Sequence, residues 1–141
     1  MDKRVLRAIG AANAFVYRRT GGKWLGRFPG GARVCLLTTT GRKSGQARTV
    51  PLLYLEDEGD IIVVASQGGA PQHPGWYVNL VAAPAAELQI GERHILVTAR
   101  TVDAADKAAL WPRLVALYPP YETYQRQTTR SIPVVRLSPV V

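Results

Sequence analysis

The chain has 141 residues, 47% of them hydrophobic, which suffices for one domain with one core and is too short for two. This composition excludes a disordered or low-complexity protein. The nearest candidate for a membrane span, residues 8–17, is too short to cross a bilayer and lacks the cleavage site of a secretory signal. We therefore expect one domain, residues 1–141, in the cytoplasm.

The net charge of +8 is distributed unevenly. Residues 1–48 hold 11 of the 18 Lys and Arg residues and one acidic residue, Asp2, so this third of the chain carries the positive charge. Such a segment favours an anionic partner: nucleic acid, anionic lipid, or a phosphorylated or carboxylated ligand. Aromatic residues are not interleaved with the basic ones as in a base-stacking platform, so we expect no nucleic-acid partner.

The first predicted element is a helix over residues 3–19, ended by Gly21 and Gly22. Its apolar stripe consists of Val5, Ile9, Ala12 and Val16, and arginines lie on another side. Residues 1–22 therefore form a basic amphipathic segment with two open interpretations. It packs against the rest of the domain, or it lies on an anionic membrane surface, which would make the protein peripheral to the inner face of the membrane.

The remaining elements alternate between strands and helices. Strand patterns bounded by turns occur at residues 33–40, 47–56, 61–66, 86–90, 94–102 and 132–137. Helices are predicted at residues 74–83, 104–118 and 121–127, with Asp103 as an N-cap and a kink at Pro112. Because hairpin-length turns join several strands, the pattern predicts an α+β fold in which six or seven mostly antiparallel strands form a small barrel with peripheral helices.

Residues 38–48 are the strongest local feature. Three threonines, Arg42, Lys43 and Arg48 surround a strand-to-strand turn with two glycines, where backbone N–H groups and cations can converge on an anion. The segment is no Walker loop, since Arg42 stands where that motif needs glycine and a strand follows. A solvated hairpin turn remains an equal alternative.

Two further segments could line a site. Residues 66–80 combine a strand end, the pair Gly68–Gly69 and a helix start, with Trp76 interpreted as a core anchor. Tyr118, Tyr121 and Tyr124 are spaced by three, so a helical turn would place them on one side, either as a wall for a flat ligand or as surface packing. The two histidines are 21 residues apart and Cys35 is near neither, so we predict no metal site. The setting of Cys35 in an apolar run favours a buried, inert thiol.

Taken together, these segments resemble the deazaflavin-dependent nitroreductase family. The match comprises LLTTTGRKSG at residues 36–45, Arg48, PLLY at 51–54, ASQGGA at 65–70, Pro74, Trp76, Asn79–Leu80, Tyr118–Pro119, Tyr124, Thr128, Arg130 and IPV at 132–134. The resemblance implies a split β-barrel of the flavin-binding superfamily and reduced coenzyme F420, an anionic deazaflavin, as cofactor. FMN is the alternative cofactor, because related split barrels bind it.

The resemblance also implies site residues. The phosphate and anionic tail would be held by Arg42, Lys43, Ser44, Gly45 and Arg48. The ring would lie along Thr49, Val50, Pro51, Leu52, Leu53 and Tyr54. The rest of the cofactor-binding site would be formed by Ala65, Ser66, Gln67, Gly68, Gly75, Trp76, Tyr77, Val78 and Asn79. The acceptor pocket would be lined by Tyr54, Tyr118, Tyr121 and Tyr124. One departure is Gln67, where the family commonly has lysine, which removes one cation near the phosphate or tail.

The implied activity is hydride transfer from reduced F420 to a small organic acceptor: a quinone, a nitroaromatic compound or an activated enone. Ser66, Tyr121 and Tyr124 are the available proton donors, although water could also supply the proton. A non-enzymatic domain that binds anions or nucleic acid is the alternative from another functional class. The sequence does not indicate the oligomeric state.

Overall fold

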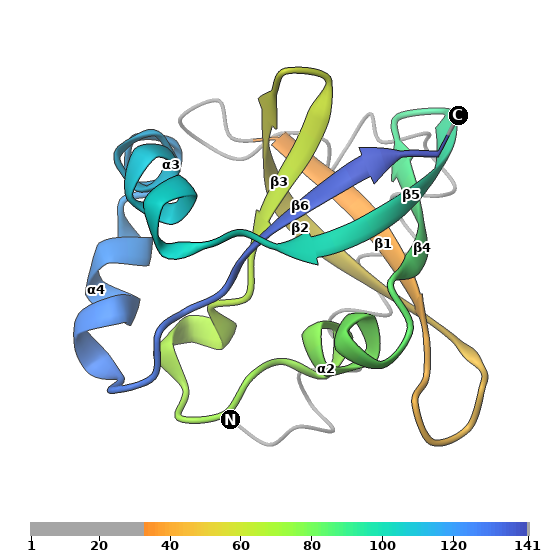
Figure 1. Cartoon of the computed structure of the whole chain (residues 1–141), viewed down its shortest axis with the longest axis horizontal. Helices are drawn as coiled ribbons and strands as arrows, with labels where there is room; N and C mark the ends of the chain where they lie inside the picture. Colours follow the sequence, from red (N-terminus) through yellow and green to blue (C-terminus); the bar gives the residue numbers. More distant parts are fainter. Residues whose placement is uncertain (1–32, 141) are drawn as a thin grey trace.

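The computed structural model describes residues 33–140 and shows a closed six-stranded barrel (Figure 1). Its strands are β1 (Arg33–Thr40), β2 (Ala47–Asp57), β3 (Asp60–Val64), β4 (Ala85–Ile90), β5 (Arg93–Thr101) and β6 (Val134–Pro139). They follow one another in the order β1-β2-β3-β6-β5-β4, and every neighbouring pair is antiparallel. The predicted α+β antiparallel barrel is confirmed, whereas segment 1–22 and the helix predicted in it lie outside the described residues.

Strand β1 closes the barrel because it pairs on both sides. It pairs with β2 along its whole length, and Leu36, Leu37 and Thr38 also pair with Gln89, Leu88 and Glu87 of β4. Since successive side chains of a strand point to opposite faces, Cys35 and Leu37 enter the barrel core while Leu36 packs on the other face. Burial raises the pKa of the Cys35 thiol to about 12, which confirms the expected inert cysteine.

Three helices and one short 3₁₀ turn complete the described chain: α2 (Gly75–Ala82), α3 (Ala104–Leu117), α4 (Pro120–Gln127) and η1 (Gln67–Gly69). Asp103 caps α3 by accepting a 2.8 Å hydrogen bond from the Asp106 N–H, as predicted, and the helix continues through Pro112. Helices α3 and α4 lie together beside the barrel and share a second apolar cluster with β3 and β6 (Figure 1). Across residues 33–140, no helix has the length and apolar character needed to cross a membrane.

Two predicted strand limits are wrong at the same place. Strand β3 ends at Val64 instead of Ser66, and β6 begins at Val134 instead of Ile132. The register pairs Val64 with Val134, and the Ala65 N–H still donates to the Pro133 carbonyl at 2.9 Å. Proline has no N–H to return that bond, so the ladder stops there. Ser66 then takes helical backbone angles (φ −78°, ψ −38°) and is the N-cap residue of η1.

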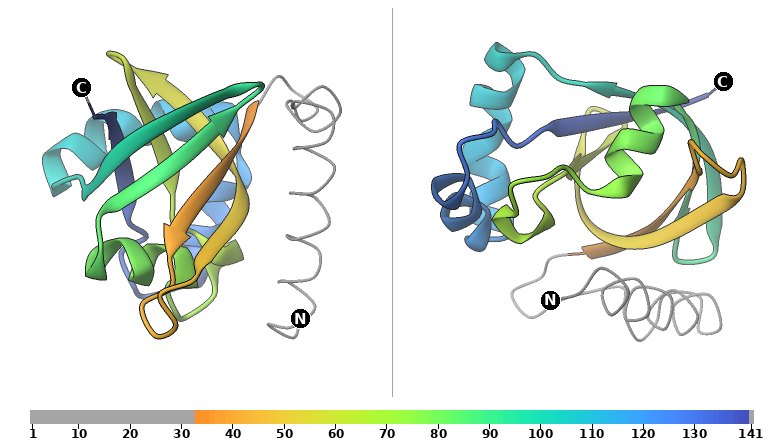
Figure 2. Two further views of the ribbon diagram at one scale, coloured as in Figure 1. Left: turned by 90° about the vertical axis from the view of Figure 1, so that its right-hand side faces the viewer. Right: turned by 90° about the horizontal axis from the view of Figure 1, so that it is seen from below.

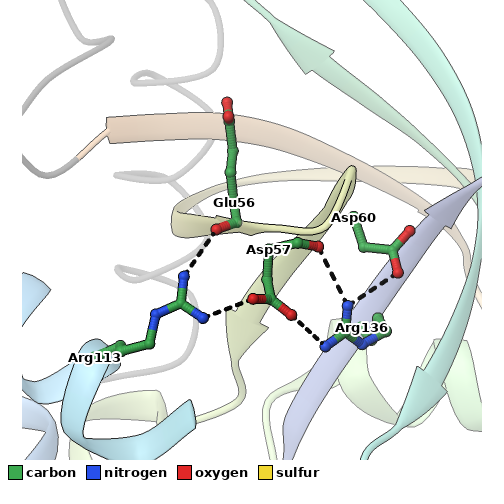
Figure 3. Close-up of polar contacts among 5 residues, drawn as sticks. All are labelled: Glu56, Asp57, Asp60, Arg113 and Arg136. Carbon is green, nitrogen blue, oxygen red and sulfur yellow. Dashed lines mark hydrogen bonds and ion pairs between the residues drawn. The ribbon is translucent and has the colours of Figure 1, made fainter.

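The turn between β2 and β3 is held by ion pairs to two other elements (Figure 3). Arg136 of β6 donates to Asp57 at 2.7 Å and to Asp60 at 3.0 Å, while Arg113 of α3 donates to Asp57 at 2.6 Å and to the Glu56 carbonyl at 3.2 Å. The Arg136 side chain is only 11% exposed, so its charge depends on these carboxylates. Asp57 therefore joins α3 to the barrel.

We expect Asp57→Asn to lower the thermal midpoint at neutral pH, because it leaves Arg136 with one carboxylate and weakens the contact of Arg113. Hydrogen bonds from Arg113 and Arg136 hold the pKa of Asp57 below its ordinary value of 3.8. A carboxyl group with a lowered pKa stabilises the fold above that value, and the contribution is lost as the pH falls through the folded-state pKa. Thermal unfolding measured from pH 7 to pH 2 should show the difference between the variant and the wild type shrinking below about pH 4. A difference that is constant over this range would contradict the assignment.

Candidate functional site

Most of the expected cofactor-binding residues lie at one end of the barrel. Because strand directions alternate, this end collects the β1–β2 turn, the end of β3, the starts of β4 and β6, and the end of β5. The β1–β2 turn, η1 and α2 gather there in Figure 1, and the right-hand view of Figure 2 looks at the molecule from this side. The candidate site is built from these three segments.

The β1–β2 turn is shaped by two glycines. The Gly41 N–H donates to the Gln46 carbonyl at 2.7 Å, the Gly45 N–H donates to the Gly41 carbonyl at 2.8 Å, and Gly45 has φ +70°. A Cβ on Gly41 would lie 2.9 Å from the Ser44 hydroxyl oxygen and 3.1 Å from the Gln46 carbonyl, so a larger residue would require the turn to shift. The compact turn leaves the side chains of Lys43 and Arg48 exposed, where they can meet an anion.

Asn79 of α2 attaches this turn to the helix. Its Oδ1 accepts from the Arg42 N–H at 3.2 Å and from Arg42 Nη1 at 2.9 Å, and its Nδ2 donates to the Thr39 hydroxyl at 3.0 Å. Asn79 is 4% exposed and Thr39 is 2% exposed, so the bond between them is shielded from water, while the bonds from Arg42 are partly buried. Asn79 therefore orients the turn and the Arg42 guanidinium.

The first turn of α2 lies next to the Arg42 guanidinium. A Cβ built on Gly75 would lie 4.0 Å from Arg42 Nη1, so the guanidinium lies beside the start of the helix. A helix start has backbone N–H groups without intrahelical acceptors, here those of Gly75 and Trp76, and it carries partial positive charge. The Trp76 side chain packs into the barrel core, which confirms its interpretation as an anchor. The arrangement suits a phosphate or carboxylate.

The η1 turn has an unusual backbone. Gln67, Gly68 and Gly69 have φ values of +43°, +62° and +79°, three left-handed residues in succession. Gly69 lies against α4, since a Cβ there would be 2.9 Å from the Tyr124 carbonyl oxygen and 3.0 Å from its Cα. Arg130, which precedes β6, donates to the carbonyl oxygens of Ala65, Ser66 and Ala70 at 3.1, 2.7 and 2.8 Å. The turn is thus held by a side chain that is distant in sequence.

The three tyrosines differ in their surroundings. Tyr121 is 6% exposed and packs against Tyr118 and Trp111, and burial raises its pKa well above the ordinary value. Tyr124 is half-buried, and its hydroxyl lies 3.4 Å from that of Tyr118. This hydrogen bond and burial raise the pKa of Tyr124, and a phenol is protonated at neutral pH in either environment. Because Tyr124 is less buried, it is better placed than Tyr121 to offer a proton.

Comparisons with known proteins decide the family. The sequence matches the family described as F420H(2)-dependent quinone reductase over residues 11–139. An F420H(2)-dependent quinone reductase of Mycobacterium tuberculosis is 42% identical over 126 residues, which cover 87% of this chain and 85% of the relative. The chain belongs to the F420H(2)-dependent quinone reductase family.

Two solved structures are similar to this chain in both sequence and fold. One is described as an F420-H2 dependent reductase, with 42% sequence identity and a TM-score of 0.69 over 74% of this chain and 93% of that one. The other is described as a domain-swapped dimer, with 37% identity and a TM-score of 0.72 over 91% and 94% of the two chains. The predicted resemblance to a deazaflavin-dependent reductase family is thereby confirmed.

The structure does not bring all the expected residues to the barrel end. Along β2, the side chains of Val50, Leu52 and Tyr54 pack into the core. Tyr54 also pairs with Arg33 at the far end of β1, so it lies away from the turn. The alternation of a strand leaves Thr49, Pro51 and Leu53 on the opposite face, where Leu53 packs against Leu36. The roles of these residues toward a ligand stay predictions.

Two features of this family member were missed from the sequence. Arg130 was recognised only as part of the resemblance, because its acceptors lie 60 to 65 residues away. His73 was considered only as a metal ligand, but its Nδ1 lies 3.0 Å from Arg130 Nη1. In the described part of the chain, no group of three His, Cys, Asp or Glu side chains could hold a metal ion. The sequence did contain one signal for the role of Arg130, namely Pro133. A proline in a strand has no N–H to donate to the facing strand, so another group must donate in its place.

We expect Gly69→Ala to be more destabilising than Gly68→Ala. Both residues have positive φ, which costs an alanine roughly 1–2 kcal/mol. A Cβ on Gly68 meets nothing within 4 Å, whereas a Cβ on Gly69 meets the backbone of Tyr124. Overpacking of this kind adds about 1–3 kcal/mol. Urea unfolding of the two variants measures the difference directly, and equal free energies of unfolding would show that η1 is not packed against α4.

Proposed function

We propose that this chain is an F420H2-dependent reductase that transfers hydride to a quinone. The observation that carries the proposal is the convergence of the β1–β2 turn with the α2 start, beside the η1 turn, which the partly buried Arg130 side chain holds in place. Membership of the family agrees with this geometry. The family description specifies F420, so FMN is not needed as an alternative cofactor.

The donor groups at this end fit the anionic part of F420. Lys43 on the turn and Arg48 at the start of β2 are exposed cations. Ser44 and Gly45 belong to the same turn as Lys43, and Arg42 is oriented toward the α2 start by Asn79. Guanidinium groups and helix N–H groups are the usual partners of phosphate and carboxylate oxygens. Reduced F420, when bound, supplies the hydride. The backbone of Ala65–Gly68 and the first turn of α2 are the proposed neighbours of its ring.

Proton donation is assigned to α4 and to the residue that precedes η1. The Tyr124 phenol carries its proton at neutral pH, and it lies on the helix against which η1 packs. Ser66 is half-buried at the start of η1 and is a second candidate donor. Tyr121 is buried in the cluster under α3, which favours a role in shaping the pocket with Tyr118. Donation to a developing negative charge lowers the barrier to hydride transfer.

The finer assignments of acceptor and location are also proposals. A pocket walled by tyrosines accommodates flat acceptors, so nitroaromatic compounds and activated enones are proposed beside quinones. The basic, amphipathic sequence of residues 3–19 supports contact with an anionic membrane surface, where quinones are found. Co-sedimentation with anionic liposomes, with and without residues 1–20, tests that contact. The domain-swapped relative makes the oligomeric state worth measuring in the same preparations.

We expect Lys43→Ala to weaken F420 binding by about tenfold to a hundredfold, the value of one charge-assisted hydrogen bond. The loss should be smaller for F420 with a shorter anionic tail, because the lysine acts on charge. Equilibrium titration of the purified protein with F420 measures the dissociation constants. Arg93→Ala is the matched control, since Arg93 is an exposed cation at the β4–β5 turn, on the opposite end of the barrel. Normal binding by Lys43→Ala would overturn the tail site, and no binding by the wild type would overturn the proposed function.

We expect Tyr124→Phe to lower kcat with a quinone by roughly a hundredfold, the usual contribution of a general acid, while F420 affinity is unchanged. Tyr118→Phe removes the hydroxyl that contacts Tyr124 and serves as the matched comparison. Steady-state kinetics with and without deuterated solvent distinguishes donation from positioning. If Tyr124→Phe turns over normally with several acceptors, the phenol is not the donor, and Ser66→Ala then tests the serine.

A further inference from the structure

Arg130 makes an unusually complete set of bonds to one backbone segment. Nη1 donates to the Ala65 carbonyl at 3.1 Å, Nη2 donates to the Ser66 carbonyl at 2.7 Å, and Nε donates to the Ala70 carbonyl at 2.8 Å. Nη1 also lies 3.0 Å from His73 Nδ1, which must accept because a guanidinium only donates. All three nitrogens of one planar group are therefore directed at residues 65–73.

The strand ladder explains why the Ala65 carbonyl needs this partner. Val64 pairs with Val134, and the Ala65 N–H donates to the Pro133 carbonyl, as in a regular antiparallel pair. The return bond would come from the N–H of residue 133, which proline lacks. Arg130 supplies the missing donor. The neighbouring carbonyl of Ser66 also accepts from the Gly69 N–H at 2.9 Å, which closes the η1 turn.

The position of Arg130 is itself determined by α4. Gln125 Nε2 donates to the Arg130 carbonyl at 2.9 Å, and Gln125 Oε1 accepts from the Ile132 N–H and from Lys107 Nζ, both at 3.0 Å. Gly69 meanwhile packs directly on the backbone of Tyr124. Two independent contacts therefore join η1 to α4: one through Gln125 and Arg130, the other through Gly69.

We propose that Arg130 is a positioning residue for hydride transfer, which holds the cofactor-facing segment 65–70 and the acceptor-facing helix α4 as one rigid unit. The inference rests on the proposed function, which assigns the cofactor to the first segment and the acceptor to the second. Arg130 acts through these backbone groups. Because three carbonyls in different directions are bound by three nitrogens of one rigid fork, lysine cannot replace it.

The test compares Arg130→Lys with Arg126→Lys. Arg126 is on the exposed side of α4 and makes a 3.7 Å ion pair with Glu122, so its exchange for lysine changes only the surface. Four quantities are measured for each protein: hydrogen exchange of residues 65–73, the dissociation constant of F420, the kinetic constants with a quinone, and the thermal midpoint. Hydrogen exchange and F420 titration do not depend on turnover.

For Arg130→Lys we expect faster exchange in residues 65–73 with unchanged protection in the barrel strands. A relaxed segment misplaces cofactor and acceptor relative to each other, so kcat should fall by about tenfold to a hundredfold. F420 should bind more weakly, and KM for the quinone should change less than kcat. Arg126→Lys should match the wild type in all four measurements. Should Arg130→Lys fail to fold, Gln125→Glu replaces it as the test variant. A glutamate keeps the two hydrogen bonds that Oε1 accepts and loses the one that Nε2 donates to the Arg130 carbonyl. We then expect the same changes in exchange, F420 affinity and kcat, on a smaller scale.

Two results would overturn the inference. One is unchanged exchange in residues 65–73, and the other is faster exchange with normal F420 affinity and normal kcat. A wild-type protein that does not bind F420 would instead contradict the proposed function. The exchange experiment would still decide whether Arg130 orders this segment, so the two failures are distinguishable.

Discussion

Antiparallel closure of the six-stranded barrel is the constraint on which the candidate site depends. Strand β1 pairs with both β2 and β4, so the chain alternates direction all the way around and every second connection emerges at the same end. The basic β1–β2 turn is brought to the η1 turn and the start of α2 for this reason, although the turn precedes α2 by about 30 residues in the sequence. A doubly wound parallel sheet would have distributed these three segments differently.

Two polar side chains convert this proximity into a defined geometry. Asn79 binds the backbone and guanidinium of Arg42, and Arg130 binds three carbonyls around η1. In both cases a side chain replaces partners that regular secondary structure does not provide, at a hairpin turn and at a strand end interrupted by Pro133. These bonds order backbone segments that would otherwise be loops, which is a requirement for a site that must hold two reactants at a fixed separation.

Charge is also separated along the barrel. The acidic β2–β3 turn lies at the end opposite to the site, where Asp57 and Asp60 are paired with Arg113 and Arg136 (Figure 3). The exposed cations Lys43 and Arg48 lie at the other end. The end of the barrel that holds the candidate site therefore presents exposed cations that suit an anionic ligand.

The sequence by itself determined the order and type of the elements in the described chain. Residues 33–40 were predicted as a strand with the limits that the structure shows, and the N-cap at Asp103 was predicted from its spacing to Asp106. Both signals are local, since strand alternation and capping involve residues a few positions apart. The family also followed from the sequence, because its motifs occur in order over nearly all of residues 33–139.

Only the tertiary structure decided which residues meet. The bond of Arg42 to Asn79 spans 37 positions, and the bonds of Arg130 to the segment around η1 span 60 to 65 positions. Periodic patterns in the sequence therefore do not predict these bonds. The shortened ends of β3 and β6 depend on the register that places Pro133 opposite Ala65. The burial of Tyr121, in contrast to the half-buried Tyr124, depends on how α3 packs over α4. Local patterns encode the period and the ends of elements, whereas these contacts arise from the pairing register and packing of elements that are remote in the chain.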